Sequence, residues 1–362
     1  MLLAATAEDG IIRLWDMRTG VQRPSIEGYA SWIRAICELP VGGRHLLATA
    51  GDDGTVRLWD TATGRTETVM DGGRLGAVGA LAETPVADGT LVASTSGDGM
   101  TRLWDPATGD QRLAMPAPGT TVTDVAALAE DDLHLLAVAG EDRVVRVWDA
   151  DRGELVKEFK QHHERVNAVC AVGTLLASGA DDLIVRVWDV HQAPGNDRAR
   201  PLLGHANWVT ALVAVRHQDT DLLVSADKNG MIRLWDPRGE LLRERQAHDA
   251  VNALAAYPLG NREVLVSAGV DRTIRLWSLD DLSPLGVLSG HKAPVTGVCP
   301  IEFGGRTLLA SVGLDRTVRL WEPRTGRLVR IIPVHHRALA CAYVGGMLVV
   351  GLDRGLLALA VR

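Results

Sequence analysis

Residues 307–321, which read TLLASVGLDRTVRLW, are one copy of a pattern that decides the fold of this chain. The copy holds an apolar run, a tight turn around Asp315, and a second apolar run that ends on Trp321. Short runs rich in Val, Ile, Leu and Thr, bounded by Gly, Pro or Asp, are typical of β-strands and their turns. Because connections this short cannot cross over a sheet, neighbouring strands are expected to be antiparallel.

The same ending recurs along the whole chain at intervals of 40 to 47 residues. The copies end at Trp15, Trp59, Trp104, Trp148, Trp188, Trp235, Trp277 and Trp321. Most of these tryptophans are followed by aspartate, and a repeat of this length with a Trp-Asp ending predicts the four-stranded blade of a β-propeller. We label its strands a to d from the axis to the rim. Such a fold is a scaffold, so function has to be argued from its surface.

Polar residues stand at fixed distances before the repeated tryptophan. Asp or Asn stands six residues before it, where a short acceptor can bond turn amides, and Ser or Thr usually stands ten residues before it. Four repeats also open with histidine; their sets are His162, Ser178, Asp182 and Trp188; His205, Ser225, Asn229 and Trp235; His248, Ser267, Asp271 and Trp277; and His291, Ser311, Asp315 and Trp321. The repeats ending at Trp104 and Trp148 lack the histidine, and Tyr29 takes its place before Trp59.

On these residues the chain resembles the WD-repeat β-propeller family, and the resemblance extends over essentially its full length. It implies an all-β fold whose blades each hold a hydrogen-bonded network of His, Ser or Thr, Asp and Trp. A Ser-His-Asp catalytic triad is needed only once, whereas this set repeats, so we interpret it as structural. Arginine stands two residues before every repeated tryptophan. We expect its stem to cover apolar surface and its head to pair with a nearby carboxylate, rather than to form a ring of positive charge.

The two ends of the chain carry incomplete repeats. Residues 28–337 hold seven full repeats, residues 1–27 supply strands b, c and d, and residues 338–362 supply strands a, b and c, with Leu359 replacing the tryptophan. Because a closed ring removes open sheet edges, we expect one propeller domain over residues 1–362. We favour eight blades with two of the six end strands displaced; seven or nine blades are the alternatives. A start inside strand b also fits the C-terminal part of a longer protein, and the resemblance implies that a kinase, protease or nucleotidase domain can precede such a propeller.

The composition narrows the class of protein and of partner. The formal net charge of −7 disfavours nucleic acid, which calls for a basic surface. No run of 18 apolar residues predicts a membrane span, and the N-terminus lacks the basic segment of a signal peptide. The four cysteines form no CxxC pair, which favours buried thiols and a cytoplasmic location. Basic residues are mostly arginine, which we interpret as the product of a high-GC, bacterial genome.

The family resemblance places partner binding on the face that carries the b–c and d–a turns. Residues beside the first apolar residue of strand a, and the residue before the turn aspartate, are expected there. This map comprises Trp32, Arg34, Asp52, Glu141, Arg165, Asn167, Asp181, Trp208, Thr210, Lys228, Asn252 and Thr296. Trp32 and Trp208 are the tryptophans outside the repeat position, and they share one register position. Since Trp and Arg dominate interface hot spots, we consider them as anchors, with coincidence or packing as the alternative.

The sequence thus predicts a non-catalytic scaffold that binds a protein or peptide and needs no cofactor or metal. It contains no nucleotide-binding, zinc-protease or hydrolase motif. The alternative is a ligand-binding or enzymatic propeller with a site at the central channel, which the mostly apolar strand-a interiors disfavour. Self-association through unpaired strands at the two ends is a further alternative.

Overall fold

The computed structural model describes 18 segments of the chain, and within them the secondary structure is β-strand, with no helix. The segments are residues 2–6, 11–16, 22–27, 33–41, 44–51, 55–60, 66–71, 78–96, 99–105, 110–116, 122–130, 133–192, 198–260, 262–303, 306–334, 337–344, 347–352 and 355–360. Side chains are described chiefly between residues 84 and 341. No helix long and apolar enough to span a bilayer occurs in these segments.

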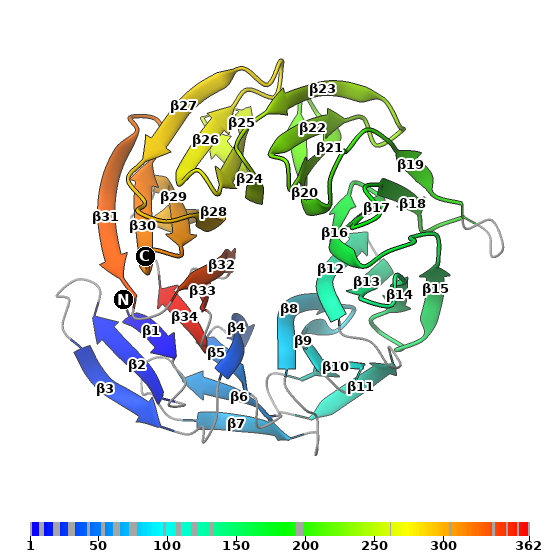
Figure 1. The fold of residues 1–362 in the computed structure, drawn as a ribbon. Helices are drawn as coiled ribbons and strands as arrows, with labels where there is room; N and C mark the ends of the chain where they lie inside the picture. Colours follow the sequence, from blue (N-terminus) through cyan, green and yellow to red (C-terminus); the bar gives the residue numbers. More distant parts are fainter. Residues whose placement is uncertain are drawn as a thin grey trace.

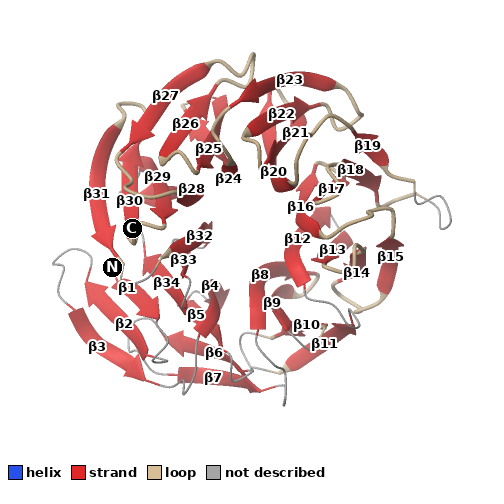
Figure 2. Cartoon of the chain, viewed as in Figure 1, coloured by secondary structure: helices blue, strands red, loops and turns tan. Residues whose placement is uncertain are grey.

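The described strands form seven antiparallel four-stranded sheets and one six-stranded sheet. Figure 1 shows them arranged as a wheel about a central opening, with the first strand of each four-stranded sheet nearest the axis and the last at the rim. Figure 2 shows that the described loops and turns, drawn in tan, connect strands within a sheet and between neighbouring sheets. This is the architecture that the repeat predicts, and short connections between sequential strands explain why every pairing is antiparallel.

The first four four-stranded sheets lie between residues 33 and 202. The first is β4 (Ile33–Val41), β5 (Arg44–Gly51), β6 (Thr55–Asp60) and β7 (Thr66–Asp71). The second is β8 (Val78–Val86), β9 (Gly89–Ser96), β10 (Met100–Trp104) and β11 (Gln111–Pro116). The third is β12 (Val122–Glu130), β13 (Leu133–Gly140), β14 (Val145–Asp149) and β15 (Leu155–Phe159). The fourth is β16 (Val166–Val172), β17 (Leu175–Ala180), β18 (Val185–Asp189) and β19 (Arg200–Leu202).

Three more four-stranded sheets follow along the chain. The fifth is β20 (Val209–His217), β21 (Thr220–Asp227), β22 (Met231–Trp235) and β23 (Leu241–Gln246). The sixth is β24 (Val251–Leu259), β25 (Arg262–Gly269), β26 (Thr273–Trp277) and β27 (Pro284–Ser289). The seventh is β28 (Val295–Phe303), β29 (Arg306–Gly313), β30 (Thr317–Glu322) and β31 (Arg327–Pro333).

The six-stranded sheet joins the two ends of the chain. Its order is β3 (Gln22–Glu27), β2 (Ile11–Asp16), β1 (Leu2–Thr6), β34 (Gly355–Ala360), β33 (Met347–Leu352) and β32 (Ala338–Val344). β1 pairs antiparallel with β34, with Leu3 opposite Leu359. The six end strands therefore lie in one continuous sheet, rather than as four strands with two displaced. This pairing covers the open edges that two three-stranded fragments would otherwise expose.

The apolar core lies between neighbouring sheets. In the fifth sheet β21 and β22 are almost entirely buried, whereas most residues of the rim strand β23 are exposed. The repeated tryptophans from Trp148 to Trp321 pack on the preceding sheet: Trp188 stacks on Phe159 of β15 with ring centroids 4.3 Å apart, and Trp235 shares a cluster with Val187 of β18. Because both faces of the inner strands are covered, they read as continuous apolar runs.

The b–c turns explain why an acidic residue stands six positions before the tryptophan. The residue after it adopts a positive φ, as in Arg143 (71°), Leu183 (68°) and Arg316 (62°). This left-handed conformation is uncommon for side chains other than glycine, so it needs support. The preceding aspartate gives that support, since Oδ1 of Asp182 accepts the backbone N–H of Ile184 at 3.2 Å. The expected bonding of turn amides is confirmed here.

Candidate interaction surface

The fourth sheet holds the complete polar network that its sequence predicts. Trp188 donates its indole N–H to Ser178 Oγ at 2.7 Å, and Ser178 Oγ lies 2.8 Å from His162 Nε2. His162 Nδ1 lies 3.0 Å from Asp182 Oδ2. When a neutral imidazole carries its proton on Nδ1, Ser178 donates to Nε2 and Nδ1–H donates to the Asp182 carboxylate, which also accepts from the Arg186 guanidinium at 2.7 Å. All four side chains are used within the sheet, so this Ser-His-Asp set is structural.

The sixth and seventh sheets repeat this geometry. In each, the tryptophan indole N–H lies 2.8 Å from the serine Oγ, and the serine Oγ lies 2.8 Å from histidine Nε2. The histidine Nδ1 lies 2.8 Å from Asp271 in the sixth sheet and 3.0 Å from Asp315 in the seventh. The residues concerned are His248, Ser267, Asp271 and Trp277, and His291, Ser311, Asp315 and Trp321.

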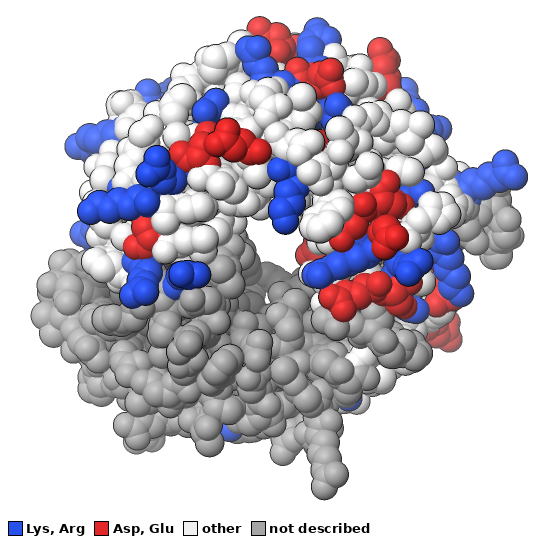
Figure 3. Space-filling view, viewed as in Figure 1, with Lys and Arg blue, Asp and Glu red and all other residues white. Residues whose placement is uncertain are grey.

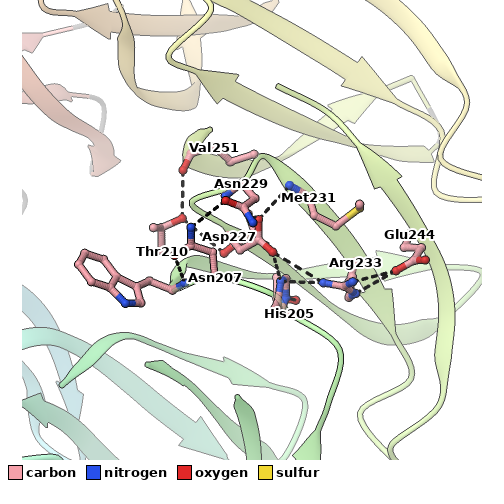
Figure 4. Close-up of polar contacts among 12 residues, drawn as sticks. His205, Asn207, Thr210, Asp227, Asn229, Met231, Arg233, Glu244 and Val251 are labelled. Carbon is pink, nitrogen blue, oxygen red and sulfur yellow. Dashed lines mark hydrogen bonds and ion pairs between the residues drawn. The ribbon is translucent and has the colours of Figure 1, made fainter. Parts of the chain in front are cut away.

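The fifth sheet forms the network with a different carboxylate. His205, Ser225 and Trp235 are linked as expected, but Asn229 is the wrong acceptor: His205 Nδ1 lies 2.8 Å from Oδ2 of Asp227. Oδ1 of Asp227 accepts the backbone N–H of Asn229 at 2.9 Å. Figure 4 shows Asp227 between His205 and the turn. Asp227 stands two residues before the usual aspartate position, at a site that holds Ala or Gly in the other three sheets with the network. It accepts from the histidine and also bonds the turn amide, as the usual aspartate does in those sheets.

The arginine two residues before the tryptophan pairs with a carboxylate of its own sheet. Its guanidinium lies near a turn or rim carboxylate in every sheet from the third to the seventh. The pairs are Arg146 with Asp142 (2.7 Å), Arg186 with Asp182 (2.7 Å), Arg233 with Glu244 (3.0 Å), Arg275 with Asp271 (2.9 Å) and Arg319 with Asp315 (3.4 Å). The expected pairing with nearby carboxylates is therefore confirmed for these five arginines.

Burial and pairing shift the protonation of the network in one direction. Burial lowers the pKa of His162 below 6.5 more strongly than Asp182 raises it, and His205, His248 and His291 are lowered for the same reason. Burial alone would raise the pKa of Asp182, but hydrogen bonds from His162 and from the N–H of His163 lower it overall. The network is therefore built from neutral histidine and ionised aspartate.

In the fourth to seventh sheets, backbone hydrogen bonds join the b–c turn to the segment before strand a. Backbone N–H groups of the turn donate to carbonyls of that segment: Asp181 to Arg165 at 2.9 Å, and Lys228 to Trp208 at 3.0 Å. Val270 and Leu314 make the same bond, to Ala250 and Pro294, at 3.1 and 3.0 Å. The expected neighbours on the turn-bearing face are thus brought together.

The side chains on this face form two close pairs. The Lys228 ammonium lies 4.9 Å from the centroid of the Trp208 ring, and Trp208 is 46% exposed. Arg165 and Glu141, from neighbouring sheets, are 3.2 Å apart and both are exposed. In the sixth and seventh sheets the corresponding positions are apolar, with Ala250, Val270, Pro294 and Leu314. The described part of the face therefore has a charged and aromatic arc beside an apolar arc, and Figure 3 shows that neither sign of charge dominates the side of the ring it displays.

Four residues of the predicted map also join neighbouring sheets. Asn167, Thr210, Asn252 and Thr296 donate to the first strand-a carbonyl of the next sheet, at 2.9, 3.0, 2.8 and 2.5 Å. They also line the central cavity. Each stands at a β-bulge, where the register of strand a against strand b shifts. A bulge re-aims a side chain, which explains how residues at this position of strand a reach both the cavity and the next sheet.

Three residues of the map lie wholly or partly outside the described part of the chain. Trp32 and Asp52 lie outside the described residues, and Arg34 belongs to β4 but its side chain lies outside them as well.

Asn167 also donates to Asp181 Oδ1 at 2.7 Å, so it links the cavity wall to the turn-bearing face. In the part of the chain with described side chains, no cluster of His, Cys, Asp and Glu is suited to a metal ion.

The repeats match a known family along most of the chain. The family model described as "WD domain, G-beta repeat" matches residues 20–60, 69–105, 111–149, 153–189, 197–236, 239–278 and 282–322. The chain belongs to this family. A solved structure, that of the computationally designed Ika8 protein, superimposes with a TM-score of 0.75 at 26% identity and covers 93% of this chain and 98% of its own.

Curated relatives match over shorter stretches. Nuclear distribution protein nudF of Emericella nidulans is 29% identical over 182 residues, which covers 44% of this chain and 40% of the relative. Nuclear distribution protein PAC1 of Arthroderma otae is 30% identical over 162 residues, or 41% and 34% of the two chains. Anaphase-promoting complex subunit cdh1 of Dictyostelium discoideum is 28% identical over 118 residues, or 33% and 15%. The match with these relatives spans at most 40% of their length.

Proposed function

We propose that this WD-repeat protein is a non-catalytic scaffold that binds a protein or peptide on the turn-bearing face, with Trp208 as an anchor. The observation that carries the proposal is the exposed Trp208–Lys228 pair. Family membership supports a role in assembly, because relatives include a subunit of the anaphase-promoting complex. The network histidines, serines and aspartates are engaged with one another within their sheets, which supports a scaffold rather than an enzyme.

The backbone around Trp208 is held in place while its ring stays accessible. Its backbone N–H donates to Asn207 Oδ1 at 2.8 Å, and its carbonyl accepts the backbone N–H of Lys228 at 3.0 Å. A pre-ordered aromatic side chain loses little entropy on binding, which is a property of interface hot spots. The neighbouring apolar arc at Ala250 and Val270 suits an apolar side chain of the partner, and Lys228 suits a carboxylate beside it.

Capture of partners by matched variants tests this proposal. Trp208→Ala removes the proposed anchor, and Ile331→Ala removes an equally exposed apolar side chain on the rim strand β31, since both residues are 46% exposed. We expect at least one captured protein to be lost with Trp208→Ala and kept with Ile331→Ala. A loss of about 2 kcal/mol, or roughly thirtyfold in affinity, is typical of a hot-spot residue. If the two variants capture every partner equally, Trp208 is not an anchor.

We also propose how the ring closes, how far the domain extends, and where the protein is located and comes from. We propose an eight-bladed ring closed by the six-stranded sheet, which the pairing of β1 with β34 supports; a crystal structure of the chain tests it. We also propose a single domain over residues 1–362, a cytoplasmic location without membrane or nucleic-acid binding, and a bacterial, high-GC source, although the relatives named above come from fungi and Dictyostelium. Fractionation of cells, titration with duplex DNA, and the base composition of the gene test these points.

A further inference from the structure

The central opening contains a cavity of about 330 Å³ between the inner strands. Its wall includes the bulge residues that join neighbouring sheets, together with Thr123 and Asp124 of β12 and small residues such as Ala168 and Ala211. The volume falls at the lower end of the range for small-ligand pockets, about 300 to 1,000 Å³. It is therefore large enough for a small organic group.

Asp124 breaks the repeat pattern of this wall. It stands two residues after the first residue of strand a, beyond the bulge of β12. The same register position holds Ala168 in β16, Ala211 in β20, Ala253 in β24 and Gly297 in β28. Alanine also stands there in β4, β8 and β32. A carboxyl group thus replaces a small apolar side chain in one inner strand out of eight.

The Asp124 carboxylate is bonded by amides but has no counter-charge on the described wall. Its Oδ1 accepts the N–H of Val125 and its Oδ2 accepts the N–H of Val169 on the next sheet, both at 2.9 Å. Burial raises the pKa of Asp124 to about 6, so the group is mostly ionised at neutral pH. The described residues that line the cavity include no Lys, Arg or His. A carboxylate accepts about four hydrogen bonds, so acceptor capacity remains.

The residues around Asp124 present acceptors rather than donors to the cavity. The Thr123 hydroxyl donates to the Val166 carbonyl at 2.6 Å, and the Asn167 side-chain amide donates to the Val209 carbonyl and to the Asp181 carboxylate. What these side chains retain is oxygen lone pairs. Oxygen acceptors beside one carboxylate are complementary to a cation that carries donors only, and an ammonium group has three donors and no acceptor.

We propose that the central cavity binds an organic ammonium group, with the Asp124 carboxylate as its counter-ion. The site is distinct from the Trp208 anchor and does not depend on it. A divalent metal ion fits poorly, because Ca²⁺ takes six to eight oxygen ligands and usually several carboxylates. An ammonium group needs one charge and a few acceptors, which the wall around Asp124 supplies.

Titration calorimetry with two probes tests this proposal and separates the sources of the ammonium group. 1,4-Diaminobutane represents a free amine, and N-acetyl-lysine methylamide represents a protein side chain; neutral 1,4-butanediol is the control ligand. We expect at least one amine, and not the diol, to bind the wild-type chain saturably. Asp124→Ala, which installs the residue of the other strands, should weaken binding by about tenfold or more, as expected for loss of a charge-assisted bond.

Two further variants keep the test decisive. Glu141→Gln removes an exposed carboxylate outside the cavity and should leave amine binding unchanged. Asp124→Ala combined with Ala211→Asp moves the carboxylate to the same register position of β20 and should restore binding. The proposal is overturned if neither amine binds the wild-type chain, or if Asp124→Ala binds as tightly as wild type. Unchanged amine binding in Trp208→Ala, beside a loss of captured protein, distinguishes this site from the outer face.

Discussion

The third and fourth sheets reach the same four-stranded geometry with different chemistry around the tryptophan. In the fourth sheet Trp188 donates to Ser178, which is linked to His162. In the third sheet Val138 stands where the serine would be, and it packs in one apolar cluster with Trp148. The arginine–aspartate pair at the turn is 2.7 Å long in both sheets. The turn pair is therefore common to both, whereas apolar contact replaces the histidine and serine.

This difference teaches that the polar network is one solution to burying an indole, and a demanding one. Once Ser178 is buried, each of its neighbours needs its hydrogen-bond partner, because an unpaired buried polar group costs about 1 to 3 kcal/mol. Val138 carries no such requirement. Single substitutions should therefore have more severe consequences in the fourth sheet than in the third.

The largest expected effect is the loss of a repeated tryptophan. Trp188→Ala opens a cavity beside Phe159 and also leaves Ser178 Oγ without its indole donor. Trp148→Ala opens a cavity in the apolar cluster. Each should lower the free energy of unfolding by about 3 to 5 kcal/mol, with the larger loss at Trp188. Chemical denaturation of both variants measures this, and a clearly larger loss for Trp148→Ala would contradict the comparison.

A smaller effect is expected when only the hydroxyl is removed. Ser178→Ala leaves the indole of Trp188 and the imidazole of His162 without their shared partner, so it should cost about 1 to 3 kcal/mol. Ser289→Ala, at an exposed position of β27, is the matched control and should stay within about 0.5 kcal/mol of wild type. Equal thermal midpoints for the two variants would show that the network contributes little.

The smallest and broadest effect is a loss of stability in acid. Burial holds the pKa of the four network histidines below the 6.5 of an unfolded chain, so the unfolded state takes up protons first as pH falls. Their contribution is complete above about pH 6.5 and is lost as pH falls through the folded-state values. The lowered pKa of Asp182 and Asp315 adds a loss in the same direction below the usual value of 3.8.

Denaturant midpoints between pH 7.5 and 5.5 measure the histidine part of this effect. We expect the midpoint of the wild-type chain to fall with pH, and we expect a shallower fall in His162→Gln, which lacks one of the four buried imidazoles. A midpoint that rises on acidification would show that the histidines are charged in the folded chain.

The sequence predicted the sheets and most of the network because the pattern is repeated. Eight aligned tryptophans fix the strand endings, and His162 or His291 is recognised by its place in the repeat. Asn229 was the wrong acceptor because the repeat position, rather than the nearby Asp227, was followed. The signal was present in the sequence, because Asp227 stands at a position that holds Ala or Gly in the other three sheets with the network.

The central wall was harder to predict for a geometric reason. The register of strand a predicts Asn167 and Thr296 on the turn-bearing face, but it does not predict that each stands at a bulge and donates to a carbonyl of the next sheet. A bulge at this point leaves no mark in the hydrophobic pattern. The pairing of Leu3 with Leu359 was equally open, because it joins opposite ends of the chain and no local signal specifies it.

The most direct test measures binding and stability in the same two variants. Trp208→Ala changes the turn-bearing face and leaves the network residues intact, whereas Ser178→Ala changes the network beneath an intact face. With a captured partner in hand, we predict that Trp208→Ala weakens its binding by roughly thirtyfold at an unchanged thermal midpoint. Ser178→Ala should lower the midpoint and leave the dissociation constant unchanged. The opposite result, with binding lost in Ser178→Ala and retained in Trp208→Ala, would contradict the assignment of binding to this face.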